Sequence, residues 1–128
     1  MTVVLDSWAI LRYLEDAEPT ASTVAKLLEQ ERPVVNWINL GEVFDVVCRL
    51  HGDDAAGQTI RDLRDAADAE LPAETRIIEA ARIKAKHALA YADAFGAATT
   101  IAHDAVLWTG DPELLVDGAR WRWRDLRS

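Results

Sequence analysis

A short apolar run near the start of the chain ends abruptly on a carboxylate. The run is Thr2-Val-Val-Leu, and the carboxylate is that of Asp6. An uninterrupted run of this kind, rich in β-branched residues, is typical of a strand that is buried on both faces. Open α/β sheets place their sites beyond the carboxyl ends of the strands, which is where Asp6 is expected. The alternative is that Asp6 or Ser7 only caps a helix at 8–14.

Strand-like and helix-like segments alternate along the rest of the chain. Further strands are expected at 33–37, 69–72, 105–108 and 121–124, and further helices at 20–30, 39–51, 53–67, 73–87 and 91–103. The segment at 69–72 contains a proline and is expected at the edge of the sheet, and the segment at 121–124 is expected to be half-exposed. Strict alternation of this kind predicts a parallel sheet with helices on both of its faces.

Finer details of the helices also follow from the pattern. Thr20 or Ser22 is expected to cap the second helix, and Asp53 or Asp54 the fourth. The helix at 73–87 is expected to turn four apolar residues inward, namely Ile77, Ile78, Ala81 and Ala85.

Length and composition predict one globular domain over residues 1–128. The single cysteine, Cys48, excludes an internal disulfide and fits a reducing compartment. No signal-like or membrane-spanning segment is visible, so a cytoplasmic protein with no membrane partner is expected. The formal charge of −8 argues against binding nucleic acid through bulk charge alone, but not against a nuclease whose acids hold cations.

Four carboxylates from distant segments are expected to converge on one edge of the sheet. Asp6 and Asp111 follow strands, while Glu42 and Asp93 lie in the first turns of helices. Each has a structural alternative: Asn39 and Glu42 have the spacing of a capping box, Asp93 suits a helix amino terminus, and Asp111-Pro112 is typical of a turn. Convergence is the more economical interpretation, because the alternative requires four independent coincidences.

Clustered carboxylates repel one another and therefore require protons or a cation. Two like charges ~4 Å apart repel by roughly 4 kcal/mol at an effective dielectric constant near 20. An all-oxygen ligand set favours Mg²⁺ or Mn²⁺ over zinc. The three histidines, His51, His87 and His103, lack the spacing of a zinc site and are expected to be surface or packing residues.

At this point the motifs resemble those of a known family. The segments are Val3-Val-Leu-Asp6-Ser7, Asn39-Leu-Gly-Glu42-Val, Leu89-Ala-Tyr91-Ala-Asp93-Ala-Phe and Thr109-Gly-Asp111-Pro112-Glu. In this order and at these distances they resemble the motifs of the PIN-domain ribonucleases. The short length and the segment from Lys84 to Asp93 resemble the VapC-type toxins of bacterial toxin–antitoxin pairs.

The resemblance implies a three-layer α/β/α fold whose parallel five-stranded sheet has the order 3-2-1-4-5. It also implies an Mg²⁺-dependent endoribonuclease that inhibits translation and growth, an RNA substrate, a cognate antitoxin and a homodimer. By motif match the acidic tetrad is Asp6, Glu42, Asp93 and Asp111. Of these, Asp6, Asp93 and Asp111 are the expected metal ligands, and Glu42 is either a ligand or the group that positions water. Auxiliary polar groups are expected from Ser7, Asn39 and Thr109.

Trp8 departs from the family pattern, in which a smaller residue is expected. Trp8 and Trp37 each follow an expected strand end, so they are candidates to stack on RNA bases, with core packing as the alternative. Lys84 and Lys86 are candidate contacts to the RNA backbone, with stabilisation of a helix carboxyl terminus as the alternative.

An apolar groove beside the acidic edge is the expected binding surface for the antitoxin. The residues expected to contribute to it are Ile10, Leu11, Leu14, Val43 and Phe44. Two rival functions are a metal-dependent phosphatase on a similar sheet and a non-catalytic protein-binding module. The phosphatase would need a second aspartate where Trp8 stands, and the binding module does not explain why all four acids are present.

Overall fold

A five-stranded parallel sheet forms the centre of the computed structural model, which describes residues 1–128. The strands are β1 (Val3–Leu5), β2 (Val34–Asn36), β3 (Asp68–Glu70), β4 (Val106–Thr109) and β5 (Arg122–Asp125). Their order is β3-β2-β1-β4-β5, and Val4 of the central strand pairs with Val34 on one side and Leu107 on the other. The expected sheet and its order are confirmed.

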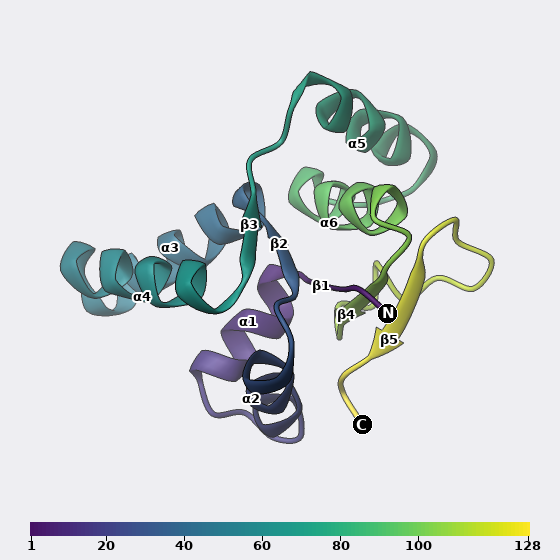
Figure 1. The fold of residues 1–128 in the computed structure, drawn as a ribbon. Helices are drawn as coiled ribbons and strands as arrows, with labels where there is room; N and C mark the ends of the chain where they lie inside the picture. The colour runs from purple at the N-terminus through teal and green to yellow at the C-terminus, as the bar shows by residue number, and fades with distance from the viewer.

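Six helices cover the two faces of this sheet. They are α1 (Ser7–Leu14), α2 (Thr20–Gln30), α3 (Trp37–His51), α4 (Asp53–Ala66), α5 (Glu74–Lys86) and α6 (Tyr91–Ala102). Helices α1 to α4 lie on one side of the sheet and α5 and α6 on the other (Figure 1). None of the six is long and apolar enough to reach across a membrane.

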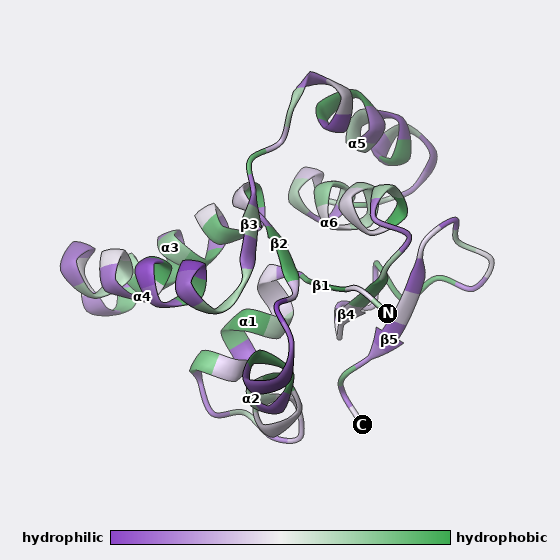
Figure 2. Ribbon diagram, in the orientation of Figure 1, coloured by the Kyte–Doolittle hydropathy of each residue, from purple (hydrophilic) through white to green (hydrophobic).

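The central strand supplies side chains to both layers of the core. Val3 and Leu5 pack into the cluster under α1 to α4, whereas Val4 packs into the cluster under α6. All three are buried, as expected of a strand whose two faces are both covered. In Figure 2, β1 has the colours of hydrophobic residues, whereas α4 is largely hydrophilic.

The last strand has the half-exposed pattern that its alternation predicts. Trp121 and Trp123 turn inward, and their indole N–H groups donate to the carbonyls of Leu114 and Val116 at 3.0 Å each. Arg122 is exposed on the other face of the strand. These two tryptophans therefore secure the edge of the sheet.

The expected start of the third helix is wrong. Helix α3 begins at Trp37 and not at Asn39, because the Asn36 side chain caps it by accepting from the N–H of Ile38 at 2.7 Å. Asn39 therefore lies inside the first turn, and it forms no capping box with Glu42. Trp37 likewise belongs to the helix and not to the strand.

The expected caps of α2 and α4 are also wrong. Thr20 is a helical residue whose hydroxyl donates to the carbonyl of Leu126, at 2.8 Å, so it secures the end of the chain. Ser22 lies further inside α2 and bonds to the Glu18 carboxylate. At α4 the capping position is Gly52, and the two aspartates lie in the first turn.

The inward face of α5 differs from the expected one. Ile77 and Ile78 are 41% and 46% exposed, and Ala85 is exposed as well, while Ala80 and Ile83 are buried. In this rotation Ala80 and Ile83 pack into the core, and the Arg76 guanidinium pairs with Glu70 of β3 at 3.1 Å.

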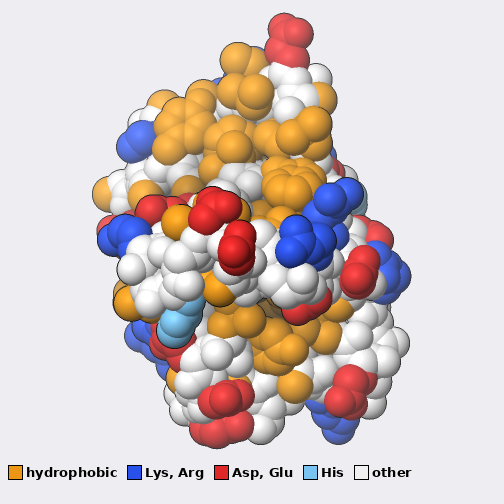
Figure 3. Space-filling view, turned by 90° about the vertical axis from the view of Figure 1, so that its left-hand side faces the viewer, with side chains coloured by type: hydrophobic (Ala, Val, Ile, Leu, Met, Phe, Trp, Pro, Cys, Tyr) orange, Lys and Arg blue, Asp and Glu red, His pale blue; other side chains and the backbone are white.

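The two exposed isoleucines, with Leu71 and Tyr91, are among the large apolar residues left on the surface. Figure 3 shows apolar side chains gathered in the upper part of the face that it views, at the height of α5 and α6 in Figure 1.

Candidate active site

Asp6 lies at the carboxyl end of β1 and is buried. One carboxylate oxygen accepts a hydrogen bond from the N–H of Ala9 at 2.9 Å, and the other accepts one from the hydroxyl of Thr109. Asp6 therefore caps α1 and also faces the strand ends, so the two interpretations of this residue are compatible. Burial raises the pKa of Asp6 to about 7, although both hydrogen bonds oppose the rise.

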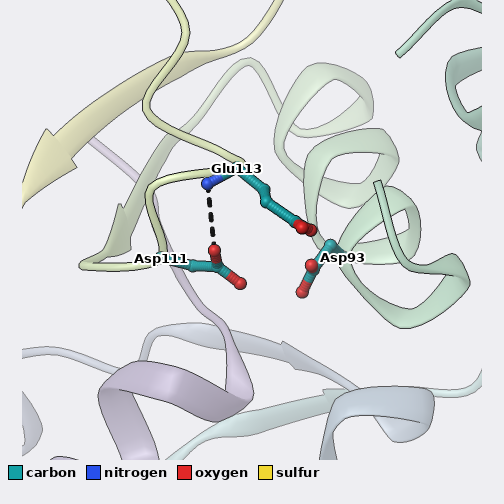
Figure 4. Close-up of side chains that lie close together, drawn as sticks. All are labelled: Asp93, Asp111 and Glu113. Carbon is teal, nitrogen blue, oxygen red and sulfur yellow. Dashed lines mark hydrogen bonds between the residues drawn. The ribbon is translucent and has the colours of Figure 1, made fainter. Parts of the chain in front are cut away.

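The turn after β4 carries two more carboxylates. The N–H of Asp111 donates to the hydroxyl of Thr109 at 3.0 Å, and the N–H of Glu113 donates to Oδ1 of Asp111 at 3.0 Å (Figure 4). The Thr109 hydroxyl thus accepts from the Asp111 backbone while it donates to Asp6. One chain of hydrogen bonds links the end of β1 to the acids of this turn.

Asp93 enters the site from the first turn of α6. Its carboxylate lies opposite Asp111 and Glu113 in Figure 4, and one ligand oxygen from each of the three lies within 4.8 Å of the others. Burial, together with the negative charges of Asp111 and Asp6, raises the pKa of Asp93 to about 8. Burial, with the repulsion between the carboxylates added to it, favours the retention of protons on Asp6 and Asp93 near neutral pH.

Glu42 comes from the second turn of α3 and is held by two donors. Its Oε1 accepts from the Ser7 hydroxyl at 2.6 Å and from the side-chain amide of Asn39 at 3.3 Å. The Asn39 amide also donates to the carbonyl of Ala92 at 3.2 Å, which ties α3 to the start of α6. Glu42 is close enough for its charge to raise the pKa of Asp6 and of Asp93.

The four acids expected to form the tetrad are therefore neighbours in the structure, and so are Ser7, Asn39 and Thr109. Glu113 is the acid that the sequence reasoning missed. The available signal was its place two residues after Asp111 in a turn, where its backbone N–H bonds to the Asp111 carboxylate and its own carboxylate faces Asp93.

Two asparagines support the site from behind. Besides capping α3 through its side-chain oxygen, Asn36 donates its side-chain amide to the hydroxyl of Thr99 of α6 at 3.1 Å. Asn39 is fully buried, and its Oδ1 has no hydrogen-bond partner. Gly96 lies beside that oxygen, and a Cβ at residue 96 would be in ordinary van der Waals contact with it, at 3.5 Å. These residues pack α6 closely against α3 and so bring Asp93 towards Glu42.

The chemistry of the donor set fits a divalent cation. None of the salt bridges in the structure involves the five acids, so no lysine, arginine or histidine neutralises them. Every candidate ligand atom is an oxygen, which suits Mg²⁺ or Mn²⁺. A carboxylate offers about four lone-pair sites, so Asp6 retains acceptor capacity beyond its two hydrogen bonds.

Two candidate RNA contacts have structural partners. The Lys84 ammonium donates to the carbonyl of Leu89 at 3.0 Å and so stabilises the connection from α5 to α6. Trp8 packs against the core and lies under the Arg12 guanidinium, 4.7 Å from the ring centroid. Lys86 is exposed at the end of α5.

Trp37 lines an apolar groove between α3 and α4. The groove has a volume of about 420 Å³ and is also lined by Leu40, Phe44 and Ile60. The Arg64 guanidinium lies 5.5 Å from the Trp37 ring. Two of the residues expected in an exposed groove, Ile10 and Val43, are fully buried, so that part of the expectation is wrong.

Comparison with known proteins gives a family and a fold. The PIN domain family matches residues 3–116. Among solved structures, VapBC2 of Rickettsia felis bound to promoter DNA aligns at a TM-score of 0.77, with 11% identity and 98% of each chain covered. VapBC-1 of nontypeable Haemophilus influenzae aligns at 0.75, with 21% identity and full coverage of both chains.

A third solved structure is that of VapC20 of Mycobacterium tuberculosis, described as a toxin that cleaves the sarcin-ricin loop. It aligns at a TM-score of 0.75, with 14% identity, over 91% of this chain and 95% of that one. At identities this low, it is the TM-scores that show a shared fold, and the fold alone. A comparison with curated protein sequences gave no match.

Proposed function

The chain belongs to the PIN-domain family, and from that premise we propose that it is a metal-dependent endoribonuclease, the toxin of a toxin–antitoxin pair. The observation that carries the proposal is the cluster of Asp93, Asp111 and Glu113 beside the buried Asp6, with raised pKa values at Asp6 and Asp93 and no cationic side chain to pair with.

In the proposed mechanism Asp6, Asp93 and Asp111 hold Mg²⁺ or Mn²⁺, and we add Glu113 to this set. A divalent ion at such a site polarises a phosphoryl oxygen and lowers the pKa of bound water. The Thr109 hydroxyl fixes the orientation of Asp6 through its hydrogen bond. The buried surroundings of Asp6 make its charge costly to maintain without a cation.

Glu42 is proposed to position the attacking water. Ser7 and Asn39 both occupy its Oε1, which leaves Oε2 without a hydrogen-bond partner in the protein. An oriented carboxylate with one free oxygen is suited to accept a proton from water that attacks a phosphodiester.

A structured RNA is the proposed substrate, and the resemblance to VapC-type toxins supports it. The VapC20 structure, which shares the fold, is described as that of a toxin that cleaves a loop of this kind. Lys86 at the end of α5 is the exposed cation that we assign to the RNA backbone, and Trp37 remains a candidate for contact with bases. The Trp8 ring already packs on Gly110 and beside Arg12. The protein is proposed to pair with itself as a homodimer.

The proposed partner is a cognate antitoxin, because the solved structures with this fold include toxin–antitoxin complexes. The groove between α3 and α4 offers it Phe44 and Ile60 as apolar contacts and Arg61 as a charge at the rim. An amphipathic segment with an apolar anchor and a nearby acid would suit this groove.

The decisive experiment incubates the purified protein with tRNA and ribosomal RNA in Mg²⁺, in Mn²⁺ and in EDTA, beside the Asp93→Asn variant. Cleavage that requires the metal and is lost in the variant supports the proposal, whereas full cleavage in EDTA refutes the mechanism. Antitoxin binding with no cleavage of any RNA by the wild type would favour a non-catalytic binding module.

A further inference from the structure

The indole of Trp8 lies directly on the backbone of Gly110. A Cβ at residue 110 would lie 2.2 Å from Cη2, 2.4 Å from Cζ2 and 2.6 Å from Cζ3 of that ring. Because three neighbouring ring atoms are almost equally near, the face of the outer ring covers the glycine, and no side chain fits between them.

Space, and not backbone conformation, is what requires glycine at this position. The φ angle of Gly110 lies outside the left-handed region, which is occupied only by Gly52 and Gly118 among the glycines. Alanine would therefore be compatible with the backbone and incompatible with Trp8. Trp8, two residues after Asp6, and Gly110, directly before Asp111, therefore fit together sterically.

This contact joins the same two segments that carry Asp6 and Asp111. Trp8 lies two residues after Asp6, and Gly110 lies between Thr109 and Asp111. The first link between these segments is the hydrogen bond from Thr109 to Asp6, and the packing of Trp8 on Gly110 is a second. Trp8 is itself anchored, because it packs against the core beneath α1.

We propose that Trp8 is a positioning residue for the metal site, in that its outer ring fixes the turn carrying Asp111 and Glu113 relative to Asp6. This inference rests on the proposed function, since it assigns Trp8 to the site that holds the metal. Residues that orient metal ligands typically change metal affinity by about 10–100-fold when they are substituted.

The test measures the Kd of Mn²⁺ from the electron paramagnetic resonance signal of free Mn²⁺, with RNA absent. Trp8→Phe keeps an aromatic ring at residue 8, but this shorter side chain lacks the three outer indole atoms that lie nearest Gly110. We expect it to weaken Mn²⁺ binding by about 10-fold or more. Trp37→Phe is the matched control, because Trp37 also starts a helix, packs on the same core and lies near an arginine, but it does not touch Gly110. Its Kd should equal that of the wild type.

A second arm asks whether steric fit is the cause. Gly110→Ala should weaken Mn²⁺ binding, and adding Trp8→Phe to it should restore part of the affinity, because the Cβ then has room. Additive losses in the double variant would contradict the steric link. A Kd for Trp8→Phe within about 2-fold of the wild type, beside a lowered Tm, would show a purely structural role and overturn the proposal.

A third arm needs no metal. The amide of Asp111 donates to Thr109, so its hydrogen exchange reports the order of the turn. Trp8→Phe should speed exchange at Asp111, and Trp37→Phe should not. If the wild type bound no Mn²⁺ at all, the proposed function would fail, and unchanged exchange at Asp111 would then overturn the positioning role as well.

Discussion

The hydroxyl of Thr109 donates a hydrogen bond to Oδ2 of Asp6, across 103 residues of sequence, and both side chains are buried. The same hydroxyl accepts the N–H of Asp111 at 3.0 Å. The Thr109 side chain thus donates a hydrogen bond to the carboxylate of Asp6 and holds the backbone of Asp111 in place. Its loss should change both the charge of Asp6 and the position of Asp111.

Thr109→Val removes this hydroxyl while it keeps nearly the same shape. The hydrogen bond lowers the pKa of Asp6, so its loss should raise that pKa further above its ordinary value. Metal ligands must be ionised, and Mn²⁺ binding by Thr109→Val should therefore weaken near pH 7 and recover at higher pH. Thr109→Ser keeps the hydroxyl and should bind like the wild type. The measurement is the Mn²⁺ Kd from pH 6 to 9, and identical profiles for all three proteins would contradict the role given to Thr109.

A divalent cation should raise the Tm of the wild type, because a ligand that binds only the folded state stabilises it. Asp6→Asn should fold, since an amide oxygen can still accept the N–H of Ala9, but its Tm should rise less with Mn²⁺ or Mg²⁺. Differential scanning fluorimetry with and without metal measures both shifts. Equal shifts in the two proteins would remove Asp6 from the site.

Stability without metal should depend on pH through Asp6 and Asp93. Their pKa values of about 7 and about 8 exceed the ordinary value of 3.8, so between pH 4 and 8 the folded state binds more protons than the unfolded state. Stability must then fall as pH rises through this range. In EDTA we expect a lower Tm at pH 8.5 than at pH 5.5, with a smaller difference in Asp93→Asn. A wild-type Tm that rises over this interval, with no change of slope in the variant, would contradict these protonation states.

The proximity of Asp6 and Asp111 was predictable because parallel topology fixes where strand ends lie. A buried strand ending on Asp6 and another ending near Asp111 have to open on the same edge of one sheet. The details that were not predictable depend on single tertiary contacts. Ile77 faces outward on a helix whose Arg76 pairs with Glu70 of β3. An ion pair between two separate segments cannot be read from the periodicity of one helix.

The helix start at Trp37 shows the same limit. Asn36 and Asn39 are equally suited to capping in sequence, and only the backbone after β2 decides between them. The steric pair of Trp8 and Gly110 was likewise invisible, since 102 residues separate its members. Trp8 was noticed as a departure from the family pattern, but its reason lies in the facing glycine.

Glu113 was missed because a turn, and not a strand end, presents it to the site. Its carboxylate lies within reach of the same ion as Asp93 and Asp111, so Glu113→Gln should weaken Mn²⁺ binding by about 10-fold. Glu79→Gln, an acid of α5 that pairs with Arg76, is the control and should bind Mn²⁺ normally. Calorimetric titration compares the two, and equal affinities would place Glu113 outside the ligand set.

The groove between α3 and α4 gives a test of the proposed antitoxin. Phe44 lines the groove and is half-buried, whereas Leu50 lies on the same helix, outside the groove, and is 68% exposed. A lysine at residue 44 would place a charge where an apolar anchor is expected, and a lysine at residue 50 would not. Phe44→Lys should therefore lose co-purification with the product of the adjacent upstream reading frame, and Leu50→Lys should retain it.

Nuclease activity separates a damaged groove from a damaged fold. Phe44 lines a groove that contains none of the five acids, so Phe44→Lys should still cleave RNA, now without inhibition by the antitoxin. If the antitoxin also presents a basic residue to the acidic site, replacing that residue should weaken inhibition, because its cation would pair with the carboxylates and compete with the metal. If the upstream protein bound Phe44→Lys and the wild type equally well, the antitoxin would have to bind elsewhere. If it bound neither, the toxin assignment would fail, although the nuclease assignment would still stand on Asp6, Asp93 and Asp111.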